Sequence, residues 1–233
     1  MATSDCLILG CEYAGKTVLC KQLRLLAAAS KEAAKKLGEA RFDTTPTIGV
    51  ELDTIYLRLT SATGAAAAVA AAKARDKDGS GSSGTTLTPV RLREVGAPMR
   101  KMWHSYYLGA RSVIFVVDAN DATIMEQAKC ELLGLVTHPL ITPGMPFAGE
   151  HPPAGGGKAR KHPTRGPDDP VPVLVLLNKS DQPFRMPRDI VDAALGLEEI
   201  KQHRPGGRFT WLEASSVTGA GLDVVLSWIA ANL

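Results

Sequence analysis

The sequence lacks the cysteine and histidine patterns that hold metals or disulfide frameworks. Its four cysteines, Cys6, Cys11, Cys20 and Cys130, contain no CxxC pair, and its five histidines form no HxxH or HExxH arrangement. Isolated thiols are typical of proteins from a reducing compartment. We therefore expect a cytoplasmic protein with neither a structural zinc site nor a disulfide framework.

Targeting and membrane signals are equally sparse. No apolar run is long enough to cross a bilayer, and an apolar segment begins as early as Cys6, which excludes a secretory signal. Position 2 is Ala2 and the sequence ends on Leu233, so the motifs for N-myristoylation and prenylation are both missing. The net charge of +3 is too small to predict nucleic-acid binding. We expect a monomer without an intrinsic lipid anchor.

Short apolar runs alternate with helical patterns, which is the order of a parallel sheet with crossover helices. Two runs, Val113–Val117 and Val173–Leu177, are continuously apolar, as in central strands covered on both faces. An α/β fold is predicted. The expected strands are Cys6–Gly10, Thr54–Leu59, Val90–Val95, Ser112–Asp118, Val171–Asn178 and Phe209–Ala214, and helices are expected to begin at Gly15, Asp121, Pro187 and Gly219, with a short one over Met99–Tyr107.

Two segments interrupt this order and lack the apolar content that offsets the entropy of folding. The segment 61–86 is rich in Ala, Gly and Ser, and the segment 143–170 is rich in Pro and Gly and carries the basic stretch Lys158–Arg165. We interpret both as flexible insertions within one domain spanning residues 1–233. The basic stretch leaves open a peripheral contact with an anionic membrane or an acidic partner. We interpret Ala27–Arg41 as an extension of the first helix.

The first chemical motif is a phosphate loop, Gly10-Cys11-Glu12-Tyr13-Ala14-Gly15-Lys16-Thr17, which matches GxxxxGK[ST]. It follows an apolar strand and opens a helix, so its backbone N–H groups and the helix N-terminus converge on an anion. Lys16 is expected to reach the β- and γ-phosphates, and the Thr17 hydroxyl to bind Mg²⁺.

The second motif, Asn178-Lys179-Ser180-Asp181, follows an apolar strand and matches NKxD, which reads guanine. The Asp181 carboxylate is expected to accept hydrogen bonds from N1–H and the exocyclic amine of guanine. Adenine offers an acceptor in place of N1–H, and a site built around a hydrogen bond rejects analogues that lack it. Lys179 is expected over the ring, and Asn178 is expected to tie this loop to the phosphate loop.

Two weaker motifs complete the set. In the run Thr45-Pro46-Thr47-Ile48-Gly49, Thr47 is a candidate ligand of Mg²⁺ in a loop that a triphosphate would order. The run Glu213–Gly219 closes the last expected strand, and the backbone N–H near Ser216 is a candidate donor to the guanine oxygen.

The four motifs in this order resemble the Ras-like small GTPases, and the ADP-ribosylation-factor branch in particular. The branch features are Glu12 in the phosphate loop, the TPTIG loop and the aromatic run Trp103–Tyr107. The resemblance implies a three-layer P-loop NTPase domain with a central, mostly parallel six-stranded sheet and one antiparallel strand. It also implies GTP or GDP with Mg²⁺ as ligands. The implied nucleotide-binding residues are Gly10, Glu12, Tyr13, Ala14, Gly15, Lys16, Thr17, Val18, Thr47, Gly96, Asn178, Lys179, Asp181, Ser215, Ser216 and Val217, and the implied metal ligands are Thr17, Thr47 and Glu94.

The chain departs from the family where hydrolysis is catalysed. The family expects Asp-x-x-Gly followed by a glutamine that orients water, whereas this chain has Glu94-Val95-Gly96-Ala97-Pro98. Glu94 is a candidate substitute for the aspartate, and Gly96 for the glycine whose N–H contacts the γ-phosphate. Pro98 stands nearest the glutamine position and has neither a side-chain amide nor a backbone N–H. No catalytic residue is identified, and we expect hydrolysis slower than the ~10⁻⁴ s⁻¹ of unassisted Ras.

Three functions remain open from the sequence. A GTP/GDP switch would bind an effector protein when triphosphate orders the Thr47 loop, with an exchange factor and an activating protein that the sequence does not name. A non-hydrolysing scaffold would bind nucleotide without switching. A P-loop small-molecule kinase would need an arginine-rich lid, for which only Arg160 and Arg165 are candidates, and it leaves NKxD without a role.

Overall fold

The structure is a computed structural model that describes residues 4–28, 44–60, 85–143, 169–204 and 208–233. Most of both predicted insertions, and most of the expected extension of the first helix, lie outside these described residues. Among the described helices, none is long and apolar enough to cross a membrane.

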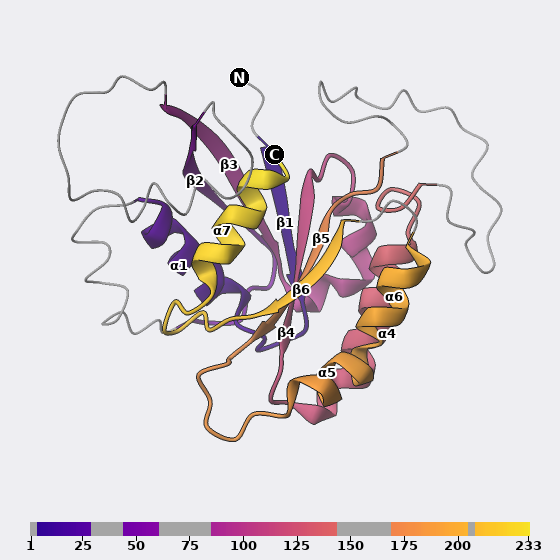
Figure 1. Cartoon of the computed structure of the whole chain (residues 1–233). Coiled ribbons are helices and arrows are strands. Elements are labelled where there is room, and N and C mark those ends of the chain that lie inside the picture. Colours follow the sequence, from indigo (N-terminus) through magenta and orange to yellow (C-terminus); the bar gives the residue numbers. More distant parts are fainter. Residues whose placement is uncertain (1–3, 29–43, 61–84, 144–168, 205–207) are drawn as a thin grey trace.

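A six-stranded sheet forms the centre of the molecule, in the order β2-β3-β1-β4-β5-β6 (Figure 1). All neighbouring pairs are parallel except β2 and β3, which pair antiparallel. This arrangement confirms the predicted fold class. The strands are β1 (Ser4–Gly10), β2 (Val50–Thr60), β3 (Thr85–Val95), β4 (Ser112–Asp118), β5 (Val173–Asn178) and β6 (Phe209–Glu213).

Helices cover both faces of the sheet (Figure 1). The helices α1 (Lys16–Ala27) and α7 (Leu222–Ala231) pack on one face, and their buried residues share a core with Ile8, Ile114 and Leu174. The opposite face carries η1 (Ala97–Tyr106), η2 (Ala122–Ile124), α4 (Met125–Thr137), α5 (Arg188–Leu195) and α6 (Leu197–His203). Every residue of β4 and β5 is buried, as their continuous apolar runs predicted.

The structure corrects several boundaries. The strands β2 and β3 extend beyond the predicted Thr54–Leu59 and Val90–Val95. Their added residues are held by antiparallel pairing between the two strands, which the alternation of apolar and polar residues in one sequence does not reveal. Thr85 and Thr86 therefore belong to β3 and not to the first insertion. The strand β5 begins at Val173 instead of the predicted Val171, and β6 ends at Glu213 instead of Ala214. The helix α7 begins at Leu222 instead of Gly219. The sequence analysis missed α6, which follows α5 directly after the left-handed Gly196.

Because β1, β3, β4 and β5 are parallel, their carboxyl ends lie at one edge of the sheet. In such sheets, ligands bind outside the carboxyl ends of the strands, where the strand order reverses. That reversal occurs at β1, which lies between β3 and β4. The loop after β1 is the predicted phosphate loop, so the fold brings it to the position where a ligand is expected.

Candidate nucleotide-binding site

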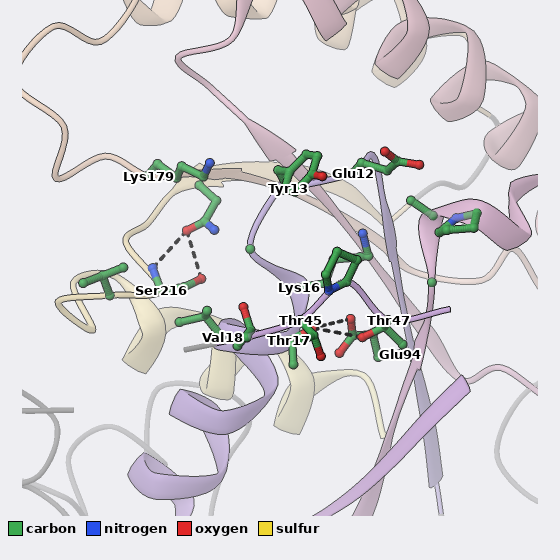
Figure 2. Close-up of a pocket in the computed structure, with 18 of the residues that line it drawn as sticks. Glu12, Tyr13, Lys16, Thr17, Val18, Thr45, Thr47, Glu94, Lys179 and Ser216 are labelled. Carbon is green, nitrogen blue, oxygen red and sulfur yellow. Dashed lines mark hydrogen bonds between the residues drawn. The ribbon is translucent and has the colours of Figure 1, made fainter. Parts of the chain in front are cut away.

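A cavity of about 370 Å³ lies at this edge of the sheet (Figure 2). Residues from five separate segments line it, including the phosphate loop, the Thr44–Thr47 run, the turn after β3, the NKxD turn and the loop after β6. The predicted site residues in its lining are Glu12, Tyr13, Gly15, Lys16, Thr17, Val18, Thr47, Glu94, Gly96, Asn178, Lys179, Asp181, Ser216 and Val217. Four motifs that are far apart in the sequence therefore meet at one cavity.

The phosphate loop depends on two glycines. Gly10 has φ 146°, and a Cβ there would lie 2.1 Å from the carbonyl oxygen of Val116. Gly15 has φ 91°, and a Cβ there would lie 2.4 Å from the side-chain nitrogen of Asn178. Both positions exclude any larger residue, because backbone or a buried amide already fills the space. Gly10 and Ala14 do not line the cavity, so they support the conformation of the loop and not its ligand-facing surface.

Backbone carbonyls of the phosphate loop hold the Lys16 side chain over the loop. Its Nζ donates to the carbonyl oxygens of Gly10 (2.9 Å) and Cys11 (2.8 Å). An ammonium has three donors, so one hydrogen remains to point at an anion. Burial lowers the pKa of Lys16, and the nearby negative charge of Glu94 opposes that shift. A phosphate would add negative charge and favour the protonated amine.

Asn178 joins three segments of the site. Its Nδ2 donates to the carbonyl oxygen of Ala14 at 2.7 Å, and its Oδ1 accepts from both the backbone N–H and the hydroxyl of Ser216 at 2.9 Å. The side chain is buried, with 1% of its surface exposed. The predicted link between the NKxD turn and the phosphate loop is therefore present as a direct hydrogen bond.

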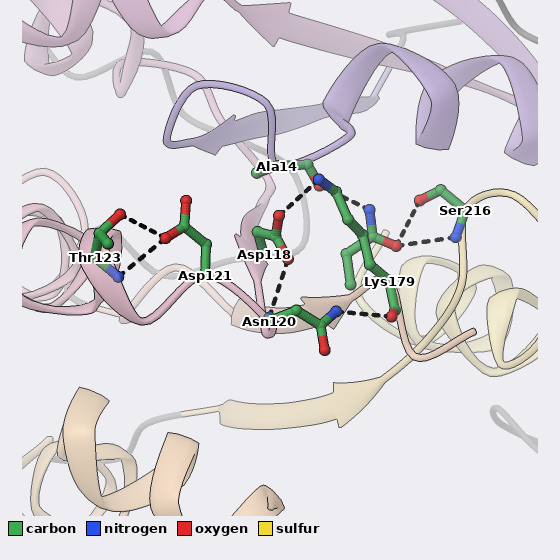
Figure 3. A network of polar contacts seen from close by, with 8 residues as sticks. Ala14, Asp118, Asn120, Asp121, Thr123, Lys179 and Ser216 are labelled. Carbon is green, nitrogen blue, oxygen red and sulfur yellow. Dashed lines mark hydrogen bonds and ion pairs between the residues drawn. The ribbon is translucent and has the colours of Figure 1, made fainter. Parts of the chain in front are cut away.

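The two charged residues of the NKxD turn have distinct partners. The Ser215 hydroxyl donates to Asp181 at 2.5 Å and itself accepts from the N–H of Thr218 at 3.0 Å. Lys179 forms an ion pair with Asp118 at 2.6 Å (Figure 3). Ser215 does not line the cavity, so its position fits an orienting role for the Asp181 carboxylate instead of a direct contact with ligand.

Three oxygen-bearing side chains meet at the other end of the cavity (Figure 2). Thr17 Oγ1 donates to Glu94 Oε1 at 2.8 Å and lies 3.2 Å from Thr47 Oγ1. Glu94 is 1% exposed, and burial raises the pKa of its carboxyl, while the bond from Thr17 and the charge of Lys16 oppose the rise. Among the described residues, Glu94 Oε2 has no hydrogen-bond partner.

This donor set fits Mg²⁺ completed by phosphate. Within the described ranges, no group of three or more His, Cys, Asp or Glu residues is placed to hold a metal alone. Mg²⁺ is commonly held by one or two carboxylates together with substrate phosphates. The buried, unpartnered oxygen of Glu94 and the two threonine hydroxyls match that description, because a cation would compensate the buried charge.

The turn after β3 is packed tightly against the Thr47 loop. The Gly96 N–H donates to the carbonyl oxygen of Gly49 at 2.9 Å, and a Cβ on Gly96 would lie 2.0 Å from the carbonyl oxygen of Thr47. The Trp103 indole N–H donates to the Gly96 carbonyl at 3.3 Å. The N–H that the sequence analysis assigned to the γ-phosphate is thus already bonded in this conformation, while Pro98 lines the cavity beside it.

Several residues that support or line the site were not predicted from the sequence. Asp118 ends the buried strand β4 and pairs with Lys179, and its signal was a polar residue directly after an apolar run. Gln22 is fully buried on α1 and donates to the Val217 carbonyl at 3.1 Å, which ties the first helix to the last loop. Thr44 and Gln182 line the cavity without a prior signal, whereas Thr45, Pro46 and Ala97 lie within motifs but were not assigned a role.

Comparisons with known proteins agree with this arrangement. A family model for the ADP-ribosylation factor family matches residues 95–142. The human ADP-ribosylation factor-like protein 16 is 29% identical over 231 residues, covering 97% of this chain and 85% of that protein. The Caenorhabditis briggsae ADP-ribosylation factor-like protein 6 is 31% identical over 136 residues, covering 58% of this chain and 55% of that protein.

Among solved structures, the Arl6 BBS3 small GTPase from Trypanosoma brucei with the bound nucleotide analogue GppNp has the same fold. Its TM-score is 0.60 at 18% identity, and the match covers 98% of this chain and 95% of that chain. These matches confirm the resemblance to the ADP-ribosylation-factor branch that the four motifs predicted. The chain is thus similar in sequence to ADP-ribosylation factor-like proteins and shares its fold with a solved small GTPase.

Proposed function

We propose that this chain binds GTP and GDP together with Mg²⁺ and acts as a switch that presents a nucleotide-dependent surface to an effector protein. The observation that carries the proposal is the convergence of a phosphate loop and an oriented Asp181 carboxylate on one cavity. A carboxylate placed to accept two hydrogen bonds selects guanine over adenine, because adenine would leave it opposite another acceptor.

Different residues would contact the base, the phosphates and the metal ion. Asp181 would read the guanine edge, and Lys179 would lie over the ring. Lys16 and the loop N–H groups would hold the phosphates, and Thr17, Thr47 and Glu94 would hold Mg²⁺, which would neutralise charge on the phosphate oxygens. The structure of the Trypanosoma brucei relative with GppNp supports a nucleotide in this fold.

Slow hydrolysis belongs to the same proposal. Pro98 lines the cavity where a water-orienting glutamine is expected, and proline supplies no amide. Without that group the attacking water loses one orienting contact, so the rate should fall below the ~10⁻⁴ s⁻¹ of unassisted Ras. An activating protein would then have to supply the missing group.

The direct test is calorimetry of the purified chain with GTP, GDP and ATP in the presence of Mg²⁺, followed by single-turnover hydrolysis on the same sample. Micromolar or tighter guanine binding with undetectable ATP binding is the expected result. The Thr17→Asn variant should bind much more weakly. Absence of guanine binding would sink the proposal, and tight ATP binding would favour a P-loop kinase.

A second candidate is a non-hydrolysing scaffold, which the bond between the Gly96 N–H and the Gly49 carbonyl favours. That bond ties the turn after β3 to the loop that contains Thr47 through the protein's own backbone. Because the Trp103 indole donates to Gly96, its fluorescence should report whether this turn moves. A spectral change between GDP and GppNp that disappears in Trp103→Phe supports the switch, and identical spectra support the scaffold.

A further inference from the structure

Backbone strain in the described chain is concentrated at the mouth of the nucleotide cavity. Tyr13, with φ 57°, and Lys179, with φ 66°, are the non-glycine residues with positive φ among those described. Both line the cavity. An L-residue in the left-handed region carries a conformational cost that glycine avoids, and such outliers gather at functional sites.

The surrounding fold explains the strain at Lys179. Its ammonium pairs with Asp118 at 2.6 Å, and its carbonyl accepts from Asn120 at 2.9 Å. The residue before it, Asn178, is buried and bonded to two other loops. These contacts fix the backbone of the turn, so the unusual φ follows from interactions that are already in place.

The loop explains the left-handed backbone of Tyr13, because such a residue helps to turn successive N–H groups toward an anion, but it does not explain the position of the side chain. Its side chain is 76% exposed, and neither hydrophobic core of the described residues includes it. The other apolar side chains of the loop, Cys11 and Ala14, are buried by comparison. Tyr13 therefore exposes a large aromatic ring to water, and neither apolar core of the described residues covers it.

The position of the ring supplies the missing explanation. Tyr13 lies at the cavity rim between Lys179 and Glu12, in the loop that leads to Lys16 (Figure 2). A ligand held by this loop would lie beneath the phenol. Contact with the ligand would remove part of the ring surface from water, which is favourable, and would close the path by which the ligand leaves.

We propose that the Tyr13 ring is a lid over the diphosphate portion of the bound nucleotide, and that it slows nucleotide release. This inference rests on the proposed function and assigns a retention role to one side chain of the same site. The bulk of the ring performs this role, so the hydroxyl group is dispensable. Tyr13 lines the cavity with its side chain exposed, so the ring is available to cover a bound ligand.

The test is the release rate of a fluorescent GDP analogue, chased with excess GDP, from the full chain and from four variants. Tyr13→Gly and Tyr13→Asn both suit a left-handed backbone and lack the ring, and each should release nucleotide about tenfold faster, a difference of about 1.4 kcal/mol. Tyr13→Phe should stay within about twofold of the unaltered chain. Tyr56→Ala removes another exposed tyrosine, on β2, and should leave release unchanged.

A second readout separates a lid from a structural role. Tyr13→Gly relieves the strained backbone, so the nucleotide-free variant should unfold at the same or a higher urea concentration while it releases GDP faster. Faster release accompanied by lower stability would overturn the inference, as would equal release rates in all variants. If the unaltered chain binds no guanine nucleotide, the proposed function fails and this inference fails with it.

Discussion

The two ends of the nucleotide cavity are built differently. At the base end, Asn178, Asp181 and Lys179 each have protein partners, and Asn178 alone connects three segments with hydrogen bonds of 2.7–2.9 Å. At the phosphate end, Thr17, Thr47 and Glu94 share two contacts, and one buried oxygen of Glu94 has no hydrogen-bond partner among the described residues.

This difference indicates which end of the cavity is stabilised more by a bound ligand. A preorganised base end discriminates between nucleotides with little rearrangement. The phosphate end keeps a buried carboxylate whose charge burial disfavours, as its raised pKa shows, so this end gains more from a cation and phosphates. The comparison predicts that base-end changes alter which nucleotide binds, and that phosphate-end changes alter how binding depends on Mg²⁺.

The largest expected effect is that of Asp181→Asn. An amide retains one acceptor but opposes the guanine amine with a donor. GTP affinity should fall about a thousandfold, which is less than the roughly 10⁴-fold typical of a lost hydrogen-bond site because one acceptor remains. Xanthine carries a carbonyl in place of that amine and should bind the variant better than guanine. Calorimetry with GTP and XTP measures both. Equal affinities of the unaltered chain and the variant for GTP would show that Asp181 does not read the base.

An intermediate effect is expected for Glu94→Gln. The amide keeps the shape of the side chain and loses its charge, so the Mg²⁺ concentration that supports half-maximal GTP binding should rise about ten- to a hundredfold. The matched control is Glu51→Gln, because Glu51 lies opposite Glu94 on β2 and is exposed. If both variants behave alike, general electrostatics and not a metal contact accounts for the effect.

The sequence predicted the base end more completely than the phosphate end. The NKxD motif identifies the base-end residues directly, and the predicted link from Asn178 to the phosphate loop is present as a hydrogen bond to Ala14. The roles of Asp118 and Gln22 depend on which strand and helix pack side by side, and one sequence does not show this. Their signal was limited to polar residues within or directly after apolar runs.

The two buried strands β4 and β5 were predictable for a similar reason. The apolar runs of β4 and β5 identify central strands without knowledge of their neighbours. In contrast, the limits of β2 and β3 depend on cross-strand pairs such as Glu51 with Glu94, in which Glu51 lies outside the predicted strand and neither residue is apolar. The bond from the Gly96 N–H to Gly49 continues that pairing, so its occurrence could not be predicted from the Glu94–Pro98 pattern alone.

The smallest expected effect is that of Pro98→Gln, which would restore the amide that the phosphate end lacks. Pro98 is exposed at the start of η1, so its replacement should change the free energy of unfolding by only about 0.5 kcal/mol. Single-turnover GTP hydrolysis should rise less than about tenfold, because no arginine is supplied from an activating protein. Pro98→Ala restores the backbone N–H without the amide and should leave the rate unchanged. An equal rise in both variants would assign the effect to the backbone, and would mean that proline itself, more than the missing glutamine, distinguishes this end of the cavity.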